Sequence, residues 1–249
     1  MSEFKLSVVI PFYNAESFIL DTLFRLSEWK QALDFPVEVI VVNDGSTDRS
    51  EELVRDFIQN SNSDIQFISY QMNRGKGNAV KIGMLSAKGS YRLFTDADIP
   101  FGLSALNEML YNLEFKEFDV CIGNRKSIKS KYFVSMTPAR RIASALFTMI
   151  ISRYVVTGVN DTQCGLKGFK GEVAERLFKD IQIKGFAFDV ELLYLSYKYE
   201  FEIKRMPVTF EGNLISTVSL GRNSVQMLWD ILCLPFCYHF TDTYKQHDE

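Results

Sequence analysis

Histidine and cysteine are scarce in this chain. Its 249 residues include 2 His, His239 and His247, both close to the C-terminus. Histidine triads and sites with several histidine ligands are therefore poor first hypotheses, and carboxylates must carry most of any chemistry. The 4 Cys include no Cys-x-x-Cys pair and have no histidines at zinc-finger spacing, so a structural zinc site is not expected.

Excess basic charge and long apolar runs are also lacking. The 28 Lys and Arg are outnumbered by 31 Asp and Glu, which argues against a nucleic-acid partner. The longest apolar candidate, residues 142–151, falls well short of the roughly 18 residues that a membrane-spanning helix needs. The N-terminus lacks the charged-then-apolar pattern of a signal peptide. We therefore expect a cytoplasmic chain, with attachment to a membrane surface left open.

The first half of the chain alternates short β-branched runs with helical patterns. Runs of this kind, which are typical of strands buried on both faces, lie at 6–11, 37–42, 65–69, 91–95 and 118–123. Apolar residues at helical spacing follow each of the first four runs. Such alternation predicts an α/β fold with a mostly parallel central sheet flanked by helices.

The second half is less regular. An amphipathic helix begins at Ser224, and Pro235 ends or kinks it. We therefore predict a main domain over residues 1–223, followed by a C-terminal amphipathic helix and tail over residues 224–249. Before residue 224, the patterns of the second half indicate a helix at 138–156, a polar glycine-bearing segment at 161–169, a second helix at 189–199 and a strand at 201–210.

Polar clusters follow the predicted strands. In a parallel sheet, ligands bind beyond the carboxyl ends of the strands, so clusters that meet there predict a binding site. Each cluster alone would be an ordinary loop. The clusters are Tyr13-Asn14, residues 44–48, residues 74–77, residues 96–98 and Asn124-Arg125.

Asp96-Ala97-Asp98 directly follows a predicted buried strand. Two carboxylates one residue apart suit a hard divalent cation and leave coordination positions open for substrate phosphates. The alternative is a solvated turn, since Asp-x-Asp is common by chance. The place of this triplet at a strand end, among the other clusters, favours the metal.

Two more clusters suit a nucleotide. Asp44 and Asp48 can accept hydrogen bonds from a base or a ribose, although Asp48 also suits a helix cap. Arg74 and Lys76, flanked by glycines, can approach a diphosphate closely. The chain has no Gly-x-Gly-x-x-Gly after the first predicted strand and no Walker-type Gly-Lys-Ser/Thr, which argues against a dehydrogenase or a nucleoside triphosphatase.

Four segments together resemble the family-2 inverting glycosyltransferases with the GT-A fold: residues 8–14, 41–48, 73–77 and 95–98. Their order and spacing agree with that family over residues 1–125. In the second half, residues 161–169 and 186–193 look like the dolichyl-phosphate glucosyltransferase branch, and the related dolichyl-phosphate mannose synthases match less closely. Two positions depart from the family pattern: Ala15, where glutamate is common and Glu16 comes next, and Thr217, where the branch tends to have lysine.

The resemblance implies a nucleotide-sugar donor, with UDP-glucose preferred, and a polyprenyl or dolichyl phosphate acceptor at the cytoplasmic face of a membrane. It implies Mg²⁺ or Mn²⁺ held by Asp96 and Asp98. The donor-binding residues that it implies are Pro11, Tyr13, Asn14, Glu16, Asp44, Asp48, Arg74, Gly75, Lys76, Asp96 and Ala97. The acceptor-binding residues that it implies are Arg125, Arg140, Ser144 and Gln163.

The chemistry implied by the resemblance is one displacement that inverts the anomeric carbon. Asp98 is then catalytic through the metal. Asp189 is the candidate general base for a hydroxyl acceptor, with Asp161 second, whereas a phosphate acceptor hardly needs a base. Two alternatives stay open: a transferase acting on a hydroxyl of a capsule or lipopolysaccharide glycan, and a non-catalytic nucleotide-sugar-binding protein. The C-terminal helix either packs on the domain or contacts a membrane surface or a membrane protein.

Overall fold

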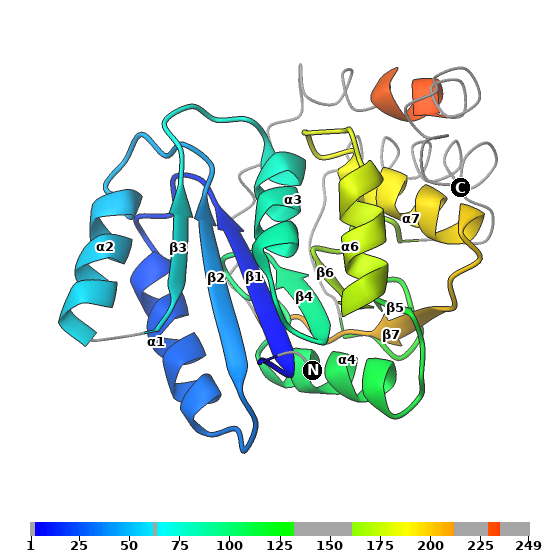
Figure 1. Cartoon of the computed structure of the whole chain (residues 1–249), viewed down its shortest axis with the longest axis horizontal. Coiled ribbons are helices and arrows are strands. Elements are labelled where there is room, and N and C mark those ends of the chain that lie inside the picture. Colours follow the sequence, from blue (N-terminus) through cyan, green and yellow to red (C-terminus); the bar gives the residue numbers. More distant parts are fainter. Residues whose placement is uncertain (1–2, 62–63, 132–160, 212–228, 235–249) are drawn as a thin grey trace.

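The computed structural model describes residues 3–61, 64–131, 161–211 and 229–234. A central sheet carries helices on both faces (Figure 1). The strands of the described part are β1 (Leu6–Phe12), β2 (Val37–Asn43), β3 (Gln66–Ser69), β4 (Tyr91–Thr95), β5 (Val120–Asn124), β6 (Leu166–Lys170) and β7 (Ile203–Pro207). The helices are α1 (Ile19–Gln31), α2 (Ser50–Ser61), α3 (Lys76–Ser86), α4 (Ser104–Glu114), α6 (Gly171–Asp180) and α7 (Phe188–Lys198), and residues 229–234 are also helical.

The sheet is mixed but mostly parallel, in the order β3-β2-β1-β4-β6-β5-β7. β1 pairs in parallel with β2 and β4, β2 with β3, and β5 with β7. β6 runs antiparallel to both of its neighbours, β4 and β5. The predicted α/β architecture is therefore confirmed, with one strand inserted against the common direction.

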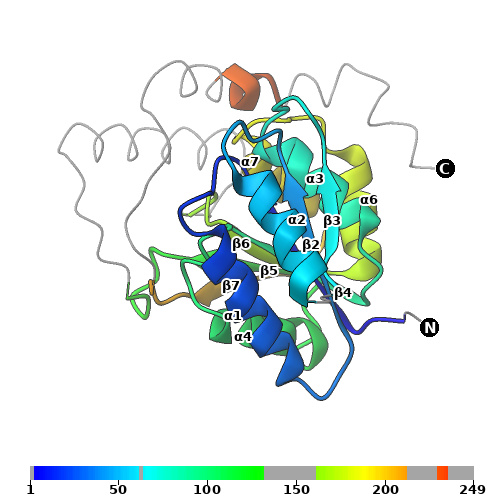
Figure 2. The same ribbon diagram turned by 90° about the vertical axis from the view of Figure 1, so that its left-hand side faces the viewer.

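Two hydrophobic layers hold the helices on the sheet. The even-numbered side chains of β1, such as Val8 and Ile10, pack with α1, α2 and α4. The next residue, Val9, points the other way and packs with α3, α6 and α7. The turned view shows α1 and α4 on one side of the sheet and α3 and α6 on the other (Figure 2). β1 and β2 are buried along their whole length, because both faces are covered.

The predicted elements agree with the observed ones over the first half, within a few residues at each end. In the second half, β6 overlaps the end of the segment 161–169 that sequence alone marked only as polar, and α6 was not predicted at all. The predicted helix at 138–156 lies outside the described residues, as do Ser224 and Pro235, so the division at residue 223 stays a prediction. Within the described ranges, every helix is too short or too polar to cross a lipid bilayer.

Candidate functional site

The loops after β1 and β2 are joined by hydrogen bonds at the carboxyl edge of the sheet. The amide of Asn14 donates to Ser46 Oγ at 3.0 Å, and the amide of Thr47 donates to Asn14 Oδ1 at 2.8 Å. Asn14 has a φ of 50°, in the left-handed region that asparagine tolerates better than most residues. The first two predicted clusters therefore lie side by side.

Asp48 and Glu16 fix the start of α2. Asp48 accepts hydrogen bonds from the amide and hydroxyl of Ser50, and its other oxygen accepts from the amide of Glu16 at 3.1 Å. Burial tends to raise the pKa of Asp48, but the hydrogen bonds from Ser50 and from the backbone amides, that of Glu16 among them, together outweigh it and hold that pKa below its usual value. Glu16 in turn accepts from the amide of Arg49 at 3.2 Å. The helix-capping alternative for Asp48 is therefore observed.

Asp44 connects the end of β2 to the glycine-bearing loop before α3. Its buried carboxylate accepts hydrogen bonds from the amides of Arg74 and Gly75, at 2.8 and 3.0 Å. It also accepts from the hydroxyl of Tyr70 at 2.7 Å. Burial and the Asp44 carboxylate raise the pKa of Tyr70, so the phenol stays a donor. Sequence reasoning missed Tyr70, which has no motif around it.

Lys76 lies among acidic side chains at the first turn of α3. Its ammonium forms an ion pair with Asp96. Burial alone would lower the pKa of Lys76, but the charges of Asp96, Asp189 and Asp98 outweigh it and raise that pKa. Burial, together with the charge of Asp96, raises the pKa of Asp98. This arrangement therefore brings together Lys76, Asp96, Asp98 and Asp189, four predicted site residues from three separate segments.

The Asp96-Ala97-Asp98 turn is held from both sides. The amide of Asp96 donates to the carbonyl of Gly165 at 3.1 Å, and Thr22 Oγ1 of α1 donates to the carbonyl of Ala97 at 2.6 Å. Gly165 lies so close that a Cβ there would come within 2.0 Å of Asp96 Oδ2. Only glycine leaves the Asp96 carboxylate where it is.

The same turn fits a hard divalent cation. Asp96 and Asp98 supply carboxylate oxygens, the ligands that Mg²⁺ and Mn²⁺ prefer. Burial first, and the charge of Asp96 second, raise the pKa of Asp98, and a bound cation would favour its ionised form. Among the described residues, no group of three or more His, Cys, Asp and Glu side chains is arranged to hold a metal ion.

Asp189, at the start of α7, forms a buried ion pair with Lys167 of β6. Both side chains are within a few per cent of complete burial, and Lys167 Nζ also donates to the carbonyl of Cys164 at 2.9 Å. Burial raises the pKa of Asp189, against the lowering influence of Lys167 and Lys76. Lys167 was not predicted, because a lysine in a polar segment is ordinarily exposed.

Arg125 and Asp161 face each other as a bidentate pair. Arg125 Nε and Nη2 lie 2.9 and 2.7 Å from the two carboxylate oxygens, and the Arg125 amide donates to the same carboxylate at 2.8 Å. Burial tends to raise the pKa of Asp161, but Arg125 outweighs it and holds that pKa low. A carboxylate so engaged is a poor proton acceptor, so Asp161 is better suited to orient Arg125 than to act as a base.

The remaining predicted residues divide into three groups. Tyr13 is 46% exposed at the edge of the site, and Gln163 is half-buried beside the Asp161 segment. Pro11 lies buried within β1, and Ala97 is buried in the acidic turn. Arg140 and Ser144 lie outside the described residues.

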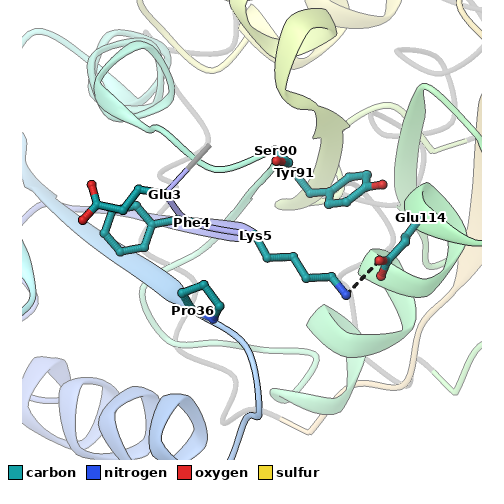
Figure 3. A pocket seen from close by; sticks show the side chains of 7 residues that line it. All are labelled: Glu3, Phe4, Lys5, Pro36, Ser90, Tyr91 and Glu114. Carbon is teal, nitrogen blue, oxygen red and sulfur yellow. Dashed lines mark ion pairs between the residues drawn. The ribbon is translucent and has the colours of Figure 1, made fainter. Parts of the chain in front are cut away.

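A hollow lies at the opposite edge of the sheet from the candidate site, by the amino ends of β1 and β4 (Figure 3). Its volume is about 390 Å³, and the ion pair between Lys5 and Glu114, at 2.8 Å, crosses it. It holds none of the predicted site residues. Its lining is Glu3, Phe4, Lys5, Pro36, Ser90, Tyr91 and Glu114.

Several dolichyl-phosphate beta-glucosyltransferases are similar to this chain in sequence. A dolichyl-phosphate beta-glucosyltransferase of Dictyostelium discoideum is 33% identical over 243 residues, which cover 94% of this chain and 74% of that protein. The human dolichyl-phosphate beta-glucosyltransferase is 32% identical over 218 residues, covering 83% of this chain and 67% of that protein.

Solved structures share the fold at lower identity. Glucosyl-3-phosphoglycerate synthase from Mycobacterium tuberculosis, in complex with Mn²⁺, UDP and glucosyl-3-phosphoglycerate, superposes with a TM-score of 0.66 at 18% identity. The match covers 93% of this chain and 79% of that one. S. aureus TarS in complex with UDP-GlcNAc gives a TM-score of 0.55 at 18% identity, covering 98% and 76%. These neighbours show the GT-A fold.

The sequence profile described as "Glycosyl transferase family 2" matches residues 7–178, which is more than half of the chain. The matched region contains the acidic turn, the glycine-bearing loop and the Arg125–Asp161 pair. With the fold, the site geometry and the sequence relatives in agreement, the chain belongs to glycosyl transferase family 2.

Proposed function

We propose that this chain transfers glucose from UDP-glucose to dolichyl phosphate, or to a similar polyprenyl phosphate, at a membrane surface. The observation that carries the proposal is the match to dolichyl-phosphate beta-glucosyltransferases over 94% of the chain. The geometry supports it, because the acidic turn at Asp96 forms an ion pair with Lys76 of the glycine-bearing loop, at the carboxyl edge of the sheet.

The donor would lie along the joined loops. Tyr13 offers an exposed aromatic ring against which a base can stack. Lys76 lies at the start of α3, where its ammonium and the positive end of the helix dipole would stabilise the negative charge of a diphosphate. Asp44 would contribute to donor binding even without touching the donor, because it fixes the loop that carries Lys76.

Asp96 and Asp98 would hold Mg²⁺ or Mn²⁺. Such an ion, when bound, stabilises negative charge on the departing diphosphate. Gly165 and Thr22 already hold the acidic turn by hydrogen bonds, so the turn would not have to move far to bind the ion. The chain's own contribution to this half of the site is thus a preset pair of carboxylates.

The acceptor would approach from the side of Arg125. Asp161 holds the guanidinium in one orientation, and a guanidinium is well suited to a phosphate. An acceptor phosphate oxygen attacks the anomeric carbon as the bond to the nucleoside diphosphate breaks, which gives a β-linked product from an α-linked donor. A phosphate monoester has its second pKa near 6, so the attacking oxygen carries no proton that a base must remove. Asp189 can therefore stay in its ion pair with Lys167.

Radiolabelled UDP-glucose with Mn²⁺ tests the proposal directly. The label should pass into the organic phase with dolichyl phosphate in detergent, and should not pass to a soluble glycan hydroxyl. Transfer to the glycan alone would replace the proposal with the hydroxyl-acceptor alternative. UDP affinity without any transfer would support the non-catalytic binding protein.

Asp98→Asn is the matched substitution. We expect a loss of transfer of about 100-fold or more, because a ligand to the charge-stabilising ion is removed while the shape is kept. Asp64→Asn is the control, since Asp64 pairs with Lys30 on the surface with 76% of its side chain exposed. Equal activity in both variants would show that the acidic turn takes no part in the reaction.

A further inference from the structure

Glu191 of α7 is a completely buried carboxylate that the mechanism above does not use. The amide of Gln182 donates one bifurcated hydrogen bond to both carboxylate oxygens of Glu191, at 3.0 Å each, and the amide of Ile183 donates to one of those oxygens at 2.8 Å. Burying a carboxylate is costly unless hydrogen bonds replace its water. Glu191 therefore fixes the backbone of the connection between α6 and α7 at two successive residues.

That connection lies against the glycine-bearing loop. In both views it lies beside the first turn of α3 (Figures 1 and 2). The carbonyl of Lys184 accepts a hydrogen bond from the amide of Asn78 at 3.1 Å. A Cβ on Gly75 would come within 2.5 Å of the Lys184 carbonyl oxygen, and one on Gly77 within 2.6 Å of the Ile183 carbonyl oxygen. The two backbones touch with no side chain between them.

A second side chain holds the same connection from α3. Lys81 Nζ donates to the carbonyl of Ile181 at 2.7 Å and to the carbonyl of Lys179 at 3.2 Å. The connection is therefore tied to α7 through its amides and to α3 through its carbonyls. Its position determines how closely it presses on Gly75 and Gly77, the two neighbours of Lys76.

We propose that Glu191 is a positioning residue for the donor site, acting through the connection at residues 181–185 to hold Lys76 and the amides around it in place for a diphosphate. The proposal rests on the proposed function for the identity of the ligand. The glycine-bearing loop is then clamped between Asp44 on one side and the Glu191-held connection on the other. The clamp determines the geometry of the site without touching the substrate.

Glu191→Gln tests this, with Glu38→Gln as the matched control. Glutamine replaces one of the two carboxylate oxygens with an NH₂ group and removes the negative charge, so the Gln182 amide loses one of its two acceptors and meets a donor in its place. Glu38 is also buried, and it accepts from Ser7 Oγ at 2.6 Å and from the amide of Lys88 at 2.9 Å. It lies at the other edge of the sheet, by the start of β1. Both variants should lose thermal stability, but only the first should affect the donor site.

The first measurement is amide hydrogen exchange of the full chain without ligand. Glu191→Gln should speed exchange in residues 73–78 and 181–185, and Glu38→Gln in neither. The second is calorimetric titration with UDP and Mn²⁺, where we expect the Kd to rise about tenfold in Glu191→Gln and to stay within about twofold in Glu38→Gln. If the wild type does not bind UDP, the donor assignment fails while the exchange measurement still decides the clamp.

Unchanged exchange in residues 73–78 would overturn the proposal, as would an equal loss of UDP affinity in both variants. Should Glu191→Gln fail to fold, Lys81→Met replaces it, because this substitution removes the other anchor of the connection from a partly exposed position. It should speed exchange in the same two segments. Exchange equal to the wild type in both segments would then contradict the clamp.

Discussion

Because Lys167 and Asp189 form a buried ion pair, we expect substitutions of the two residues to cause large and non-additive losses of stability. Its side chains are 1% and 5% exposed. Removing one partner of such a pair leaves a charge without compensation, which costs about 3–5 kcal/mol. Replacing both with apolar residues of similar volume is often neutral. We therefore expect Lys167→Met and Asp189→Leu each to destabilise the fold strongly, and the double variant to lose less than either.

The assay is urea unfolding followed by far-UV circular dichroism, with a thermal scan beside it. For a domain of this size, about 1 kcal/mol corresponds to a shift in Tm of roughly 2–4 °C, so each single variant should melt roughly 6–20 °C below the wild type. Lys167 Nζ also donates to the Cys164 carbonyl, so Lys167→Met leaves that acceptor without its partner. We expect the double variant to melt above Lys167→Met.

Two results would refute the reasoning. Losses below about 1 kcal/mol in both single variants would mean that the charges are not held out of water. Strictly additive losses in the double variant would mean that the two residues do not act as a pair. The surface pair Lys179–Glu175, in which both side chains are more than half exposed, is the control. Substituting either of its residues should change the free energy of unfolding only slightly.

Two further predictions concern the edge of the site. Because Arg125 holds the pKa of Asp161 below its usual value, Asp161 stabilises the fold above about pH 4, the ordinary pKa of an aspartate, and that contribution is lost as pH falls through the lowered pKa. Asp161→Asn should therefore weaken the fold at pH 7 more than at pH 3 in urea unfolding, and an equal deficit at both would contradict the pairing. Gly165→Ala should lower kcat/KM about 100-fold, since its Cβ would displace the Asp96 carboxylate. A kcat/KM of Gly165→Ala within about twofold of the wild type would refute the steric argument.

The strands of the first half could be predicted because burial on both faces leaves a clear sequence signal. β1 and β2 are continuous β-branched runs. β6 could not be predicted in the same way. Its sequence, Leu-Lys-Gly-Phe-Lys, carries a lysine that is buried only because Asp189 lies opposite it. A pairing between distant residues leaves no periodic pattern.

The candidate site, like the strands, has one part that the sequence predicts and another that depends on the tertiary fold. The polar clusters were predicted as a convergent set because strand ends in a parallel sheet share an edge. The structure brings Lys76, Asp96, Asp98 and Asp189 together, and their roles stay predictions. Tyr70 and Glu191 were missed, since Tyr70 donates to a buried carboxylate 26 residues away, and Glu191 accepts from loop amides that become its partners only when α7 packs in the fold. Such partners depend on the tertiary fold.

The reversed direction of β6 has a consequence for synthesis of the protein on the ribosome. The parallel part made of β1 to β4 is complete once residue 95 has emerged, but one edge of β4 stays bare until residues 166–170 arrive to pair with it. A nascent chain of intermediate length therefore presents an open strand edge, Tyr91–Thr95, that can join a neighbouring chain. Shortened products that end before residue 166 should aggregate for this reason, and chaperones should bind the nascent chain over that interval.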